Sequence, residues 1–489
     1  MGVGLSVTSR AIFDGLLGQF QQKYEAVLRL EPREGKGPVP SGDPAKSGNT
    51  LRELLARKSR VFGWPLREGE PCGPSEILQL CHALLSNRGE ATGMALSEEI
   101  LAAWSGLDDR GRLKVMRGLL ADFGPDVSAL ERAIADYGAS ATAENLRRLH
   151  EASEPRRQEL IRRLNLARNG IVTLVDMRRQ LQDFMKEDAG LAVLDADFLH
   201  LFSSWFNRGF LMLRRIDWST PASILEKIIR YEAVHEIRDW EDLRRRLEPE
   251  DRRCFAFFHP QLPEEPLIFV EIALTREISA DIAALLADRS AFVPAAEATA
   301  AVFYSISNCQ PGLKGVSFGN FLIKQVVEEL RRDLPNLKTF VTLSPVPGLA
   351  GWLSRNGYLA DKAGEGEAGI EPETLLTGAF RYFFAGRTAN GRHVDPVARF
   401  HLGNGARLER ILLEADRSQK GVRQSFAVMV NYLYKPDEIE ANHEAYVERG
   451  EVAASRDLQR HWRAIRQQAG KARPGAGGNR TDSNAGSRG

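Results

Sequence analysis

The feature that most constrains the fold is a continuous unit of strand, glycine-rich loop and helix. The stretch "TAAVFYSIS", residues 299–307, is short and apolar, as a buried strand is. It is followed by a loop that contains Gly312, Gly315 and Gly319. Over residues 322–330, apolar side chains then fall on one helical face and polar or charged ones on the other. This unit indicates a region of mixed α/β structure.

The junction of loop and helix predicts a site for an anion. A helix N-terminus presents unpaired backbone N–H groups and a partial positive charge. Glycines let the backbone come close to a ligand, so the combination suits a phosphate. On this stretch alone, an equally good interpretation is that the glycines only shape a turn. The spacing matches neither the dinucleotide fingerprint nor the P-loop.

Length and charge exclude several classes of protein. The chain has 489 residues, which predicts two or three domains. Its net charge is +1, and its arginine-rich runs are interleaved with acids, which argues against a nucleic-acid partner. No apolar run approaches the ~20 residues of a membrane span, and the N-terminus lacks a signal-peptide core. We therefore expect a cytoplasmic protein with no nucleic-acid or membrane partner.

Cysteine and histidine spacing predicts neither a disulfide framework nor a metal site. The four cysteines are far apart and form no C-x-x-C pair. The nine histidines form neither an H-x-x-x-H nor an H-E-x-x-H pair. We therefore expect a reducing compartment and no catalytic metal.

Periodicity divides the chain into a helical region and a mixed region. Residues 1–187 are predicted to form an all-α domain, with a flexible Pro/Gly-rich loop at 31–49. One helical stretch is predicted to run over residues 160–185. Residues 188–465 alternate strand-length apolar runs with helices, which predicts a central sheet. The tail, 466–489, has no apolar stretch and is predicted to be disordered.

Ser344 is the first candidate site residue. It lies in "TFVTLSPVPGLAGWL", where a strand is predicted to end at Ser344, two prolines force a turn, and a helix starts near Gly348. Sheet proteins usually place ligand-binding groups at such strand ends. Taken alone, the stretch favours the alternative that the hydroxyl only caps the turn.

His401 is the second candidate, in "DPVARFHLGNGARL". Asp395 suits an N-cap, Pro396 the first helical position, and Gly403 or Gly405 the helix end. The result is a helix of one or two turns that carries His401 near its end. A histidine between apolar neighbours suits a general acid or base. The alternative, favoured without further context, is a core histidine that donates to a carbonyl.

These stretches carry a resemblance to a known family. "FYSISNCQPGLKGVSFGNFLIKQVVEELRRDLPNLKTFVTLSPVPGLAGWL", then "DPVARFHLGNGA" and "MVNYLY", resemble the malonyl-CoA decarboxylase family over about residues 231–434. The resemblance implies an α+β multidomain protein. An N-terminal all-α helical bundle would precede an α/β catalytic domain like that of the acyl-CoA N-acyltransferases (GNAT). The loop departs from the Q/R-x-x-G-x-G/A signature of ordinary acetyltransferases.

The resemblance also implies residue roles. Ser344 and His401 match the two catalytic positions of the family, which also contact substrate, and Tyr434 resembles a further substrate-binding position. The loop residues that would receive malonyl-CoA, with its diphosphate near the helix N-terminus, are Lys314, Gly315, Val316, Ser317, Phe318, Gly319 and Asn320.

The activity implied by the resemblance is a metal-independent decarboxylation of malonyl-CoA to acetyl-CoA and CO2. The enolate would be protonated by His401, with Ser344 fixing the reactive torsion, although the two roles could be exchanged. No cofactor is implied, because coenzyme A is part of the substrate. The family suggests a homo-oligomer, a dimer or a tetramer, in malonate or fatty-acid metabolism. The alternatives are a CoA-dependent acyltransferase of the GNAT type and a non-catalytic CoA-binding scaffold.

Overall fold

The structure is a computed structural model, and it describes residues 72–86, 89–287, 292–316, 321–358 and 370–471. The predicted loop at 31–49 lies outside these residues, as does the part of the predicted tail from residue 472 on. Residues 466–471, the described part of the predicted disordered tail, belong instead to the helix Arg456–Lys471. No helix in the described part of the chain is both long and apolar enough to cross a bilayer.

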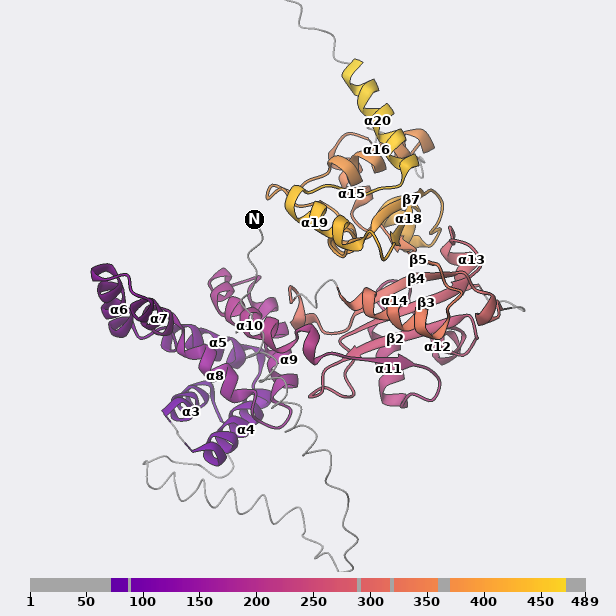
Figure 1. Ribbon diagram of the computed structural model, residues 1–489. Helices are drawn as coiled ribbons and strands as arrows, with labels where there is room; N and C mark the ends of the chain where they lie inside the picture. Colours follow the sequence, from indigo (N-terminus) through magenta and orange to yellow (C-terminus); the bar gives the residue numbers. More distant parts are fainter. Residues whose placement is uncertain (1–71, 87–88, 288–291, 317–320, 359–369, 472–489) are drawn as a thin grey trace, which may run out of the picture. The chain divides into compact units, whose positions relative to one another are not determined.

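The first described region consists of helices, drawn from indigo to magenta in Figure 1. Its elements are α3 (Pro74–Ser86), α4 (Glu90–Gly106), α5 (Asp109–Asp122), α6 (Val127–Ala139), α7 (Ala143–Ser153), α8 (Arg156–Leu164), α9 (Gly170–Phe184), η1 (Ala189–Leu191), α10 (Ala192–Trp205) and η2 (Arg208–Phe210). Helices thus continue past residue 187, and the first strand begins only at Met212. The exact division into domains stays a prediction.

The single helical stretch predicted over residues 160–185 is wrong, because α8 and α9 are separate helices. The chain leaves the helical conformation at Asn169, whose φ is +58°. Gly170 then begins α9 so close to the end of α8 that a Cβ atom there would lie 2.4 Å from the carbonyl oxygen of Leu164. Only glycine permits this approach. The apolar periodicity spans the break because both helices bury their faces in one bundle.

The second region contains an eight-stranded sheet in the described part of the chain. Its strands are β1 (Met212–Ile216), β2 (Arg252–Phe258), β3 (Ile268–Thr275), β4 (Ala300–Asn308), β5 (Thr339–Thr342), β6 (Ser344–Pro345), β7 (Arg407–Leu412) and β8 (Met429–Tyr434). The order is β1-β2-β3-β4-β5-β8-β6, with β7 also paired to β8. Neighbours are antiparallel except β4 and β5, which are parallel.

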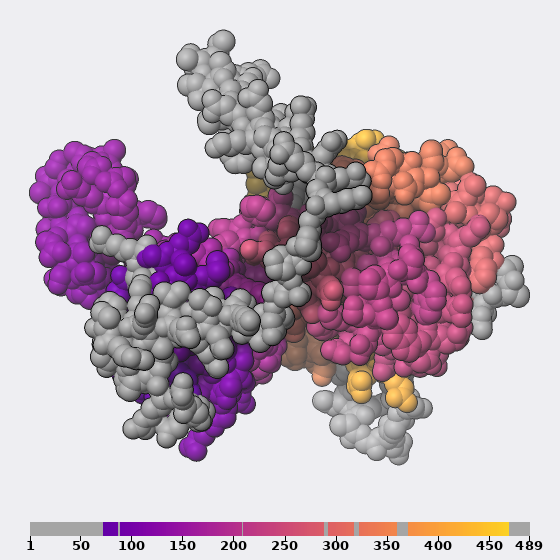
Figure 2. All heavy atoms as spheres, turned by 90° about the horizontal axis from the view of Figure 1, so that it is seen from below, coloured from indigo at the N-terminus to yellow at the C-terminus, as the bar shows by residue number. Residues whose placement is uncertain are grey.

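Helices cover both faces of this sheet. Successive side chains along a strand point to opposite faces, so apolar residues at consecutive positions need cover on both. The helical elements of the region are α11 (Ala222–Tyr231), α12 (Trp240–Leu247), α13 (Ile282–Leu286), η3 (Ala295–Glu297), η4 (Pro311–Leu313), α14 (Phe321–Asp333), α15 (Leu349–Arg355), α16 (Pro372–Ala385), α17 (Pro396–Gly403), α18 (Gln419–Ser425), α19 (Ile439–Arg449) and α20 (Arg456–Lys471). On β2, Phe255 and Phe257 face the core that contains α14, whereas Ala256 and Phe258 face α11 and α12. On the face seen in Figure 2, atoms in the magenta of residues 222–247, the segment that contains α11 and α12, form much of the surface.

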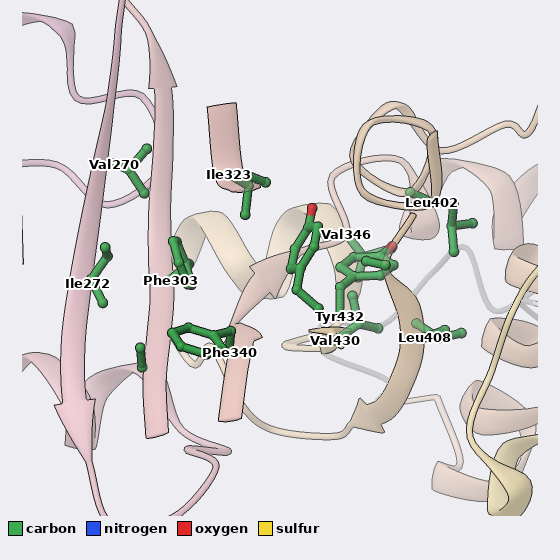
Figure 3. Packing of buried hydrophobic residues seen from close by; sticks show 14 of the residues in the cluster. Val270, Ile272, Phe303, Ile323, Phe340, Val346, Leu402, Leu408, Val430 and Tyr432 are labelled. Atoms are coloured by element: carbon green, nitrogen blue, oxygen red, sulfur yellow. The ribbon is translucent and has the colours of Figure 1, made fainter. Parts of the chain in front are cut away.

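The predicted strand–loop–helix unit is confirmed as β4, η4 and α14. The apolar face of α14 packs on the sheet, where Ile323 lies near Phe303 and Phe340 in the same core (Figure 3). That core continues to Val346, Leu402, Leu408 and Val430, so α14, α17 and β8 share one apolar interior. Burial of this interior from water is the main force that holds these elements in place.

The strand predicted to end at Ser344 is divided in two. β5 ends at Thr342, and β6, Ser344–Pro345, pairs with β8 instead of continuing beside β4. β4 and β5 pair only as far as Phe303 and Thr342, although β4 runs on to Asn308. The two parallel strands therefore part at the level of Ser344.

Candidate active site

Three side chains that the sequence singled out meet at the point where β4 and β5 part. The Ser344 Oγ lies 3.2 Å from the His401 Nε2, and the other ring nitrogen, Nδ1, lies 2.8 Å from the Tyr434 hydroxyl. The three residues come from β6, α17 and β8. All three are buried, with exposed fractions of 5% for Ser344, 3% for His401 and 1% for Tyr434.

Helix α17 places His401, and its predicted capping is confirmed. The Asp395 carboxylate accepts a hydrogen bond from the Ala398 backbone N–H at 2.7 Å, and Pro396 occupies the first turn. The Tyr382 hydroxyl donates to the same carboxylate at 2.9 Å, so the cap is itself held in place. The helix ends at Gly403, and the chain turns away through Gly405, whose φ is +79°.

Burial controls the protonation of the site. The His401 ring is stacked on Tyr432, with the ring centroids 4.6 Å apart. Burial lowers the pKa of His401 from its ordinary 6.5 to about 3, so the ring is neutral at physiological pH. Burial also raises the pKa of Tyr434 well above 10, so its hydroxyl keeps its proton. A neutral imidazole has one N–H donor and one acceptor nitrogen.

The hydrogen bonds assign those two ring nitrogens. The Ser344 hydroxyl donates to the Thr342 Oγ1 at 2.8 Å, and the backbone N–H of Tyr432 donates to the same oxygen at 3.1 Å. Because the serine proton is directed at Thr342, the contact with His401 is made by an Nε2–H that donates to the serine oxygen. Nδ1 is then the acceptor for the Tyr434 hydroxyl. The chain of donors runs from Tyr434 through His401 and Ser344 to Thr342.

The sequence interpretation missed Thr342. It is fully buried and lies two residues before Ser344, so the two side chains point to the same side of the backbone. That spacing within a strand was the available signal. Threonine is also a common strand former, which hid the polar role of this one.

A cavity of about 500 Å³ lies beside α17 and the glycine-rich loop. Lys314, Gly315 and Val316 line it, and from α17 so do Arg399 and Phe400. His401, Ser344 and Tyr434 do not themselves line it. Its lining does include residues on both sides of His401 in the chain, because Gly403 of α17 and Asn404 just after the helix line it as well. The remaining predicted loop residues, Ser317, Phe318, Gly319 and Asn320, lie outside the described residues.

A larger hollow of about 860 Å³ contains none of the candidate site residues. Its lining includes residues of β7 and α20, and it carries both positively and negatively charged side chains. Arg407, for example, is paired with Glu409 at 2.8 Å and with Glu438 at 3.3 Å. Lys435 is likewise paired with Glu438 at 2.6 Å.

The loop is also held from the helical region. Arg178 of α9 is 2% exposed, and its Nη1 donates to the backbone carbonyls of Gly312 and Lys314, each at 2.8 Å. Its Nε donates to the Asp195 carboxylate of α10 at 2.9 Å. A Cβ atom at Gly312 would lie 2.0 Å from the backbone oxygen of Val175, so the loop touches α9 directly. The sequence interpretation missed Arg178 too.

No three His, Cys, Asp or Glu side chains are grouped so as to hold a metal ion, as far as the described residues go. The four cysteines are free thiols. The side chains that meet at the site are a neutral histidine and hydroxyl groups.

Two family models match the chain. The model of the malonyl-CoA decarboxylase N-terminal domain matches residues 123–206, and that of the C-terminal domain matches residues 209–368 and 361–472. The chain is 33% identical, over 464 aligned residues, to the mitochondrial malonyl-CoA decarboxylase of Anser anser anser, covering 84% of this chain and 88% of the relative. It is 32% identical to the mitochondrial enzyme of Rattus norvegicus, covering 88% and 94%.

Solved structures give the same result. The crystal structure of malonyl-CoA decarboxylase from Rhodopseudomonas palustris is 51% identical, with a TM-score of 0.75 over 80% of this chain and 100% of that one. The enzyme from Agrobacterium vitis is 54% identical, with a TM-score of 0.74 over 79% and 99%. Both halves of the described chain thus have counterparts in solved proteins.

Proposed function

Because the chain belongs to the malonyl-CoA decarboxylase family, we propose that it decarboxylates malonyl-CoA to acetyl-CoA and CO2. The family is one of carboxy-lyases. The observation that carries the proposal is the buried group of Ser344, His401 and Tyr434 beside a cavity formed by the predicted loop.

The reaction makes three demands on the site. The breaking C–C bond must be held perpendicular to the thioester plane, so that its electrons flow into the carbonyl. The oxyanion of the resulting enolate must receive hydrogen bonds. One proton must reach the former methylene carbon. Because the thioester carbonyl is the electron sink, we propose a route that uses no metal and no organic cofactor.

We assign the proton to His401. In the free protein the ring is neutral, since burial holds its pKa near 3. A bound malonyl carboxylate would bring a negative charge beside the ring, and an opposite charge favours the protonated imidazolium. The proton gained in this way is delivered to carbon after CO2 leaves. It accounts for the one proton that the conversion of malonyl-CoA to acetyl-CoA and CO2 consumes.

Ser344 and Tyr434 act on either side of that ring. The Ser344 hydroxyl, held by Thr342 in the free protein, is placed to turn toward the malonyl carboxylate or the thioester oxygen and so fix the reactive torsion. The Tyr434 hydroxyl donates to Nδ1 while the ring is neutral, and it accepts a hydrogen bond from the Nδ1–H once the ring is protonated. The ring is thereby kept in one orientation through both protonation states.

The cavity beside α17 would hold part of the acyl-CoA. Lys314, Gly315 and Val316 line it, and Lys314 and Arg399 supply positive charge for phosphate groups. By resemblance to the family, Ser317, Phe318, Gly319 and Asn320 would complete the substrate-binding loop.

Three further proposals rest on the family and the sequence. A GNAT-like topology of the sheet region is supported by the parallel neighbours β4 and β5, which part beyond Phe303 and Thr342. A homo-oligomer, dimer or tetramer, is what the family suggests. A cytoplasmic location stays a proposal, and the names of the animal relatives carry the word mitochondrial.

The test is mass spectrometry of the purified protein incubated with malonyl-CoA alone, beside a His401→Ala sample. We expect acetyl-CoA from the wild type and none above background from the variant. With no acceptor present, an acyltransferase or a CoA-binding scaffold would leave malonyl-CoA intact. Intact substrate with the wild type would therefore rule the proposal out, and equal turnover by both proteins would remove His401 from the mechanism.

A further inference from the structure

One buried side chain of the helical region, Arg178, is hydrogen-bonded to the glycine-rich loop. Arg178 uses one nitrogen for the carbonyls of Gly312 and Lys314 and its other two for Asp195. The planar guanidinium presents its donors in a fixed fork, so it fixes the directions of these groups as well as their positions.

The direction of the Lys314 carbonyl determines where the next N–H points. No cis peptide bond occurs among the described residues, and in a trans peptide the C=O and the following N–H point in opposite directions. Because the Lys314 carbonyl points to Arg178, the N–H of Gly315 points away from it. Gly315 is one of the residues that line the 500 Å³ cavity.

This N–H has no backbone acceptor among the described residues, whereas its neighbours do. The N–H groups of Leu313, Lys314 and Val316 donate to Gln310, Pro311 and Leu313 within the turn. Gly315 itself has a φ of +84°, a conformation that glycine adopts without strain. The backbone at Gly315 is thus arranged as a donor for a ligand.

We propose that Arg178 is a positioning residue that orients the Lys314–Gly315 peptide so that its N–H donates to an anionic oxygen of the bound acyl-CoA. This inference rests on the proposed function and gives the helical region a part in it. Without the guanidinium, the Lys314 carbonyl is free to turn toward the cavity, where its negative end would repel the same anion.

Arg157 offers a matched control. It is also buried, at 5% exposed, and is paired with Asp197, two residues along α10 from the partner of Arg178. No hydrogen bond joins it to the loop among the described contacts. Arg157→Met and Arg178→Met each leave a carboxylate of α10 without its cation, so both should destabilise the fold to a similar degree.

The experiment measures kcat and KM for malonyl-CoA in the wild type and the variants. The dissociation constants of CoA and malonyl-CoA are measured by calorimetry for the same variants combined with His401→Ala, so that the substrate is not consumed during the titration. We expect Arg178→Met to raise KM about tenfold or more, as loss of a hydrogen bond to a charged group does, with a smaller change in kcat. Arg157→Met should keep the wild-type KM. Arg178→Lys keeps the charge beside Asp195 but not the fork, so it should fold well and still show a raised KM.

The two ligands locate the anionic oxygen. Equal weakening of CoA and malonyl-CoA assigns it to the CoA portion, and weakening of malonyl-CoA alone assigns it to the carboxylate. A wild-type KM in both Arg178 variants, or an equal rise in the Arg157 variant, overturns the inference. If the wild type binds CoA without decarboxylating malonyl-CoA, the proposed function fails while the binding comparison still decides the role of Arg178. A wild type that binds neither compound overturns both.

Discussion

His401, Ser344 and Tyr434 are held entirely by the sheet region, whereas the loop that lines the cavity is held in part by the helical region. The first group depends on α17, β6 and β8, which share one apolar interior. The loop depends on Arg178 and on contact with α9. The difference suggests that the sheet region governs the rate of the chemical step and the helical region governs affinity. Substitutions in the two regions should therefore separate kcat from KM.

The largest effect should come from His401→Ala. A positioned acid contributes about 10²–10⁴-fold, so kcat should fall by that factor while KM changes little. Steady-state kinetics with malonyl-CoA would measure both constants. His150→Ala, an exposed histidine of α7, is the control and should behave as the wild type. A change confined to KM in His401→Ala would break the proposed separation.

Thr342→Val should lower kcat about 10- to 100-fold, because the freed serine proton could then be donated to the His401 Nε2 and reverse the hydrogen-bond chain. Thr342→Ser keeps the hydroxyl and should recover most of the activity. Nitrogen NMR of histidine-labelled protein should find the His401 proton on Nε2 in the wild type and on Nδ1 in the valine variant.

Ser425→Ala is the control for this series, because it removes an equally buried hydroxyl from α18. It should not change kcat. Equal losses in the valine and serine variants of Thr342 would mean that the residue only supports packing.

Acid should remove the stability that three buried neutral histidines contribute to the sheet region. Burial lowers the pKa of His401 to about 3 and those of His235 and His393 to about 4, from an ordinary 6.5. Unfolding lets these rings bind protons below pH 6.5, whereas the folded state stays neutral until about pH 4. The contribution of these rings to stability is therefore full above pH 6.5 and falls with pH, by up to about 2 kcal/mol per ring between pH 7 and pH 5. Burial raises the pKa of Glu271 to about 8, so this carboxyl contributes with the opposite sign over the same interval.

The melting temperature, measured from pH 7 to pH 5, would test whether stability changes with pH in the expected direction. Hydrogen exchange corrected for intrinsic rates should show loss of protection in β4, α17 and β8 first. The same free-enzyme pKa predicts no inflection near pH 6.5 in kcat/KM from His401. A His393→Asn variant isolates the contribution of one ring, and it should lose less stability than the wild type between pH 7 and pH 5. An equal loss in the two proteins would contradict the neutral, buried state of that ring.

Gly315→Ala should give the smallest effect. Its φ of +84° costs an L-residue about 1–2 kcal/mol, so the loop should relax and KM should rise severalfold with kcat nearly unchanged. Gly138→Ala in α6, where a Cβ atom meets nothing within 4 Å, is the control. A loss of kcat in Gly315→Ala would mean that the loop takes part in the chemical step.

Local patterns were sufficient to predict much of the sheet region. The strand at 299–307, the helix that follows it and the Asp395 cap are each specified by residues close in sequence. Ser344 and His401 were found because they stand at the ends of such elements. That they lie 3.2 Å apart was not predictable from either stretch, since 57 residues separate them.

The sequence was least informative where distant backbones meet. Arg178 and Gly312 are 134 residues apart, and an arginine in an amphipathic helix is normally taken as solvent-facing. The break between α8 and α9 escaped notice because it depends on the approach of Gly170 to another helix end. Both features are tertiary constraints that periodicity does not record.

The contact between Gly312 and the backbone of Val175 has a consequence for protein engineering. A Cβ atom at position 312 would lie 2.0 Å from the Val175 carbonyl oxygen, so this position accepts no side chain while α9 stays in place. A chimera that combines the sheet region with the helical region of a relative would therefore need a matching α9 surface, arginine included. Ser344, His401 and Tyr434 could therefore be transferred with the sheet region alone. The substrate-binding loop would have to be transferred together with the α9 that contacts it.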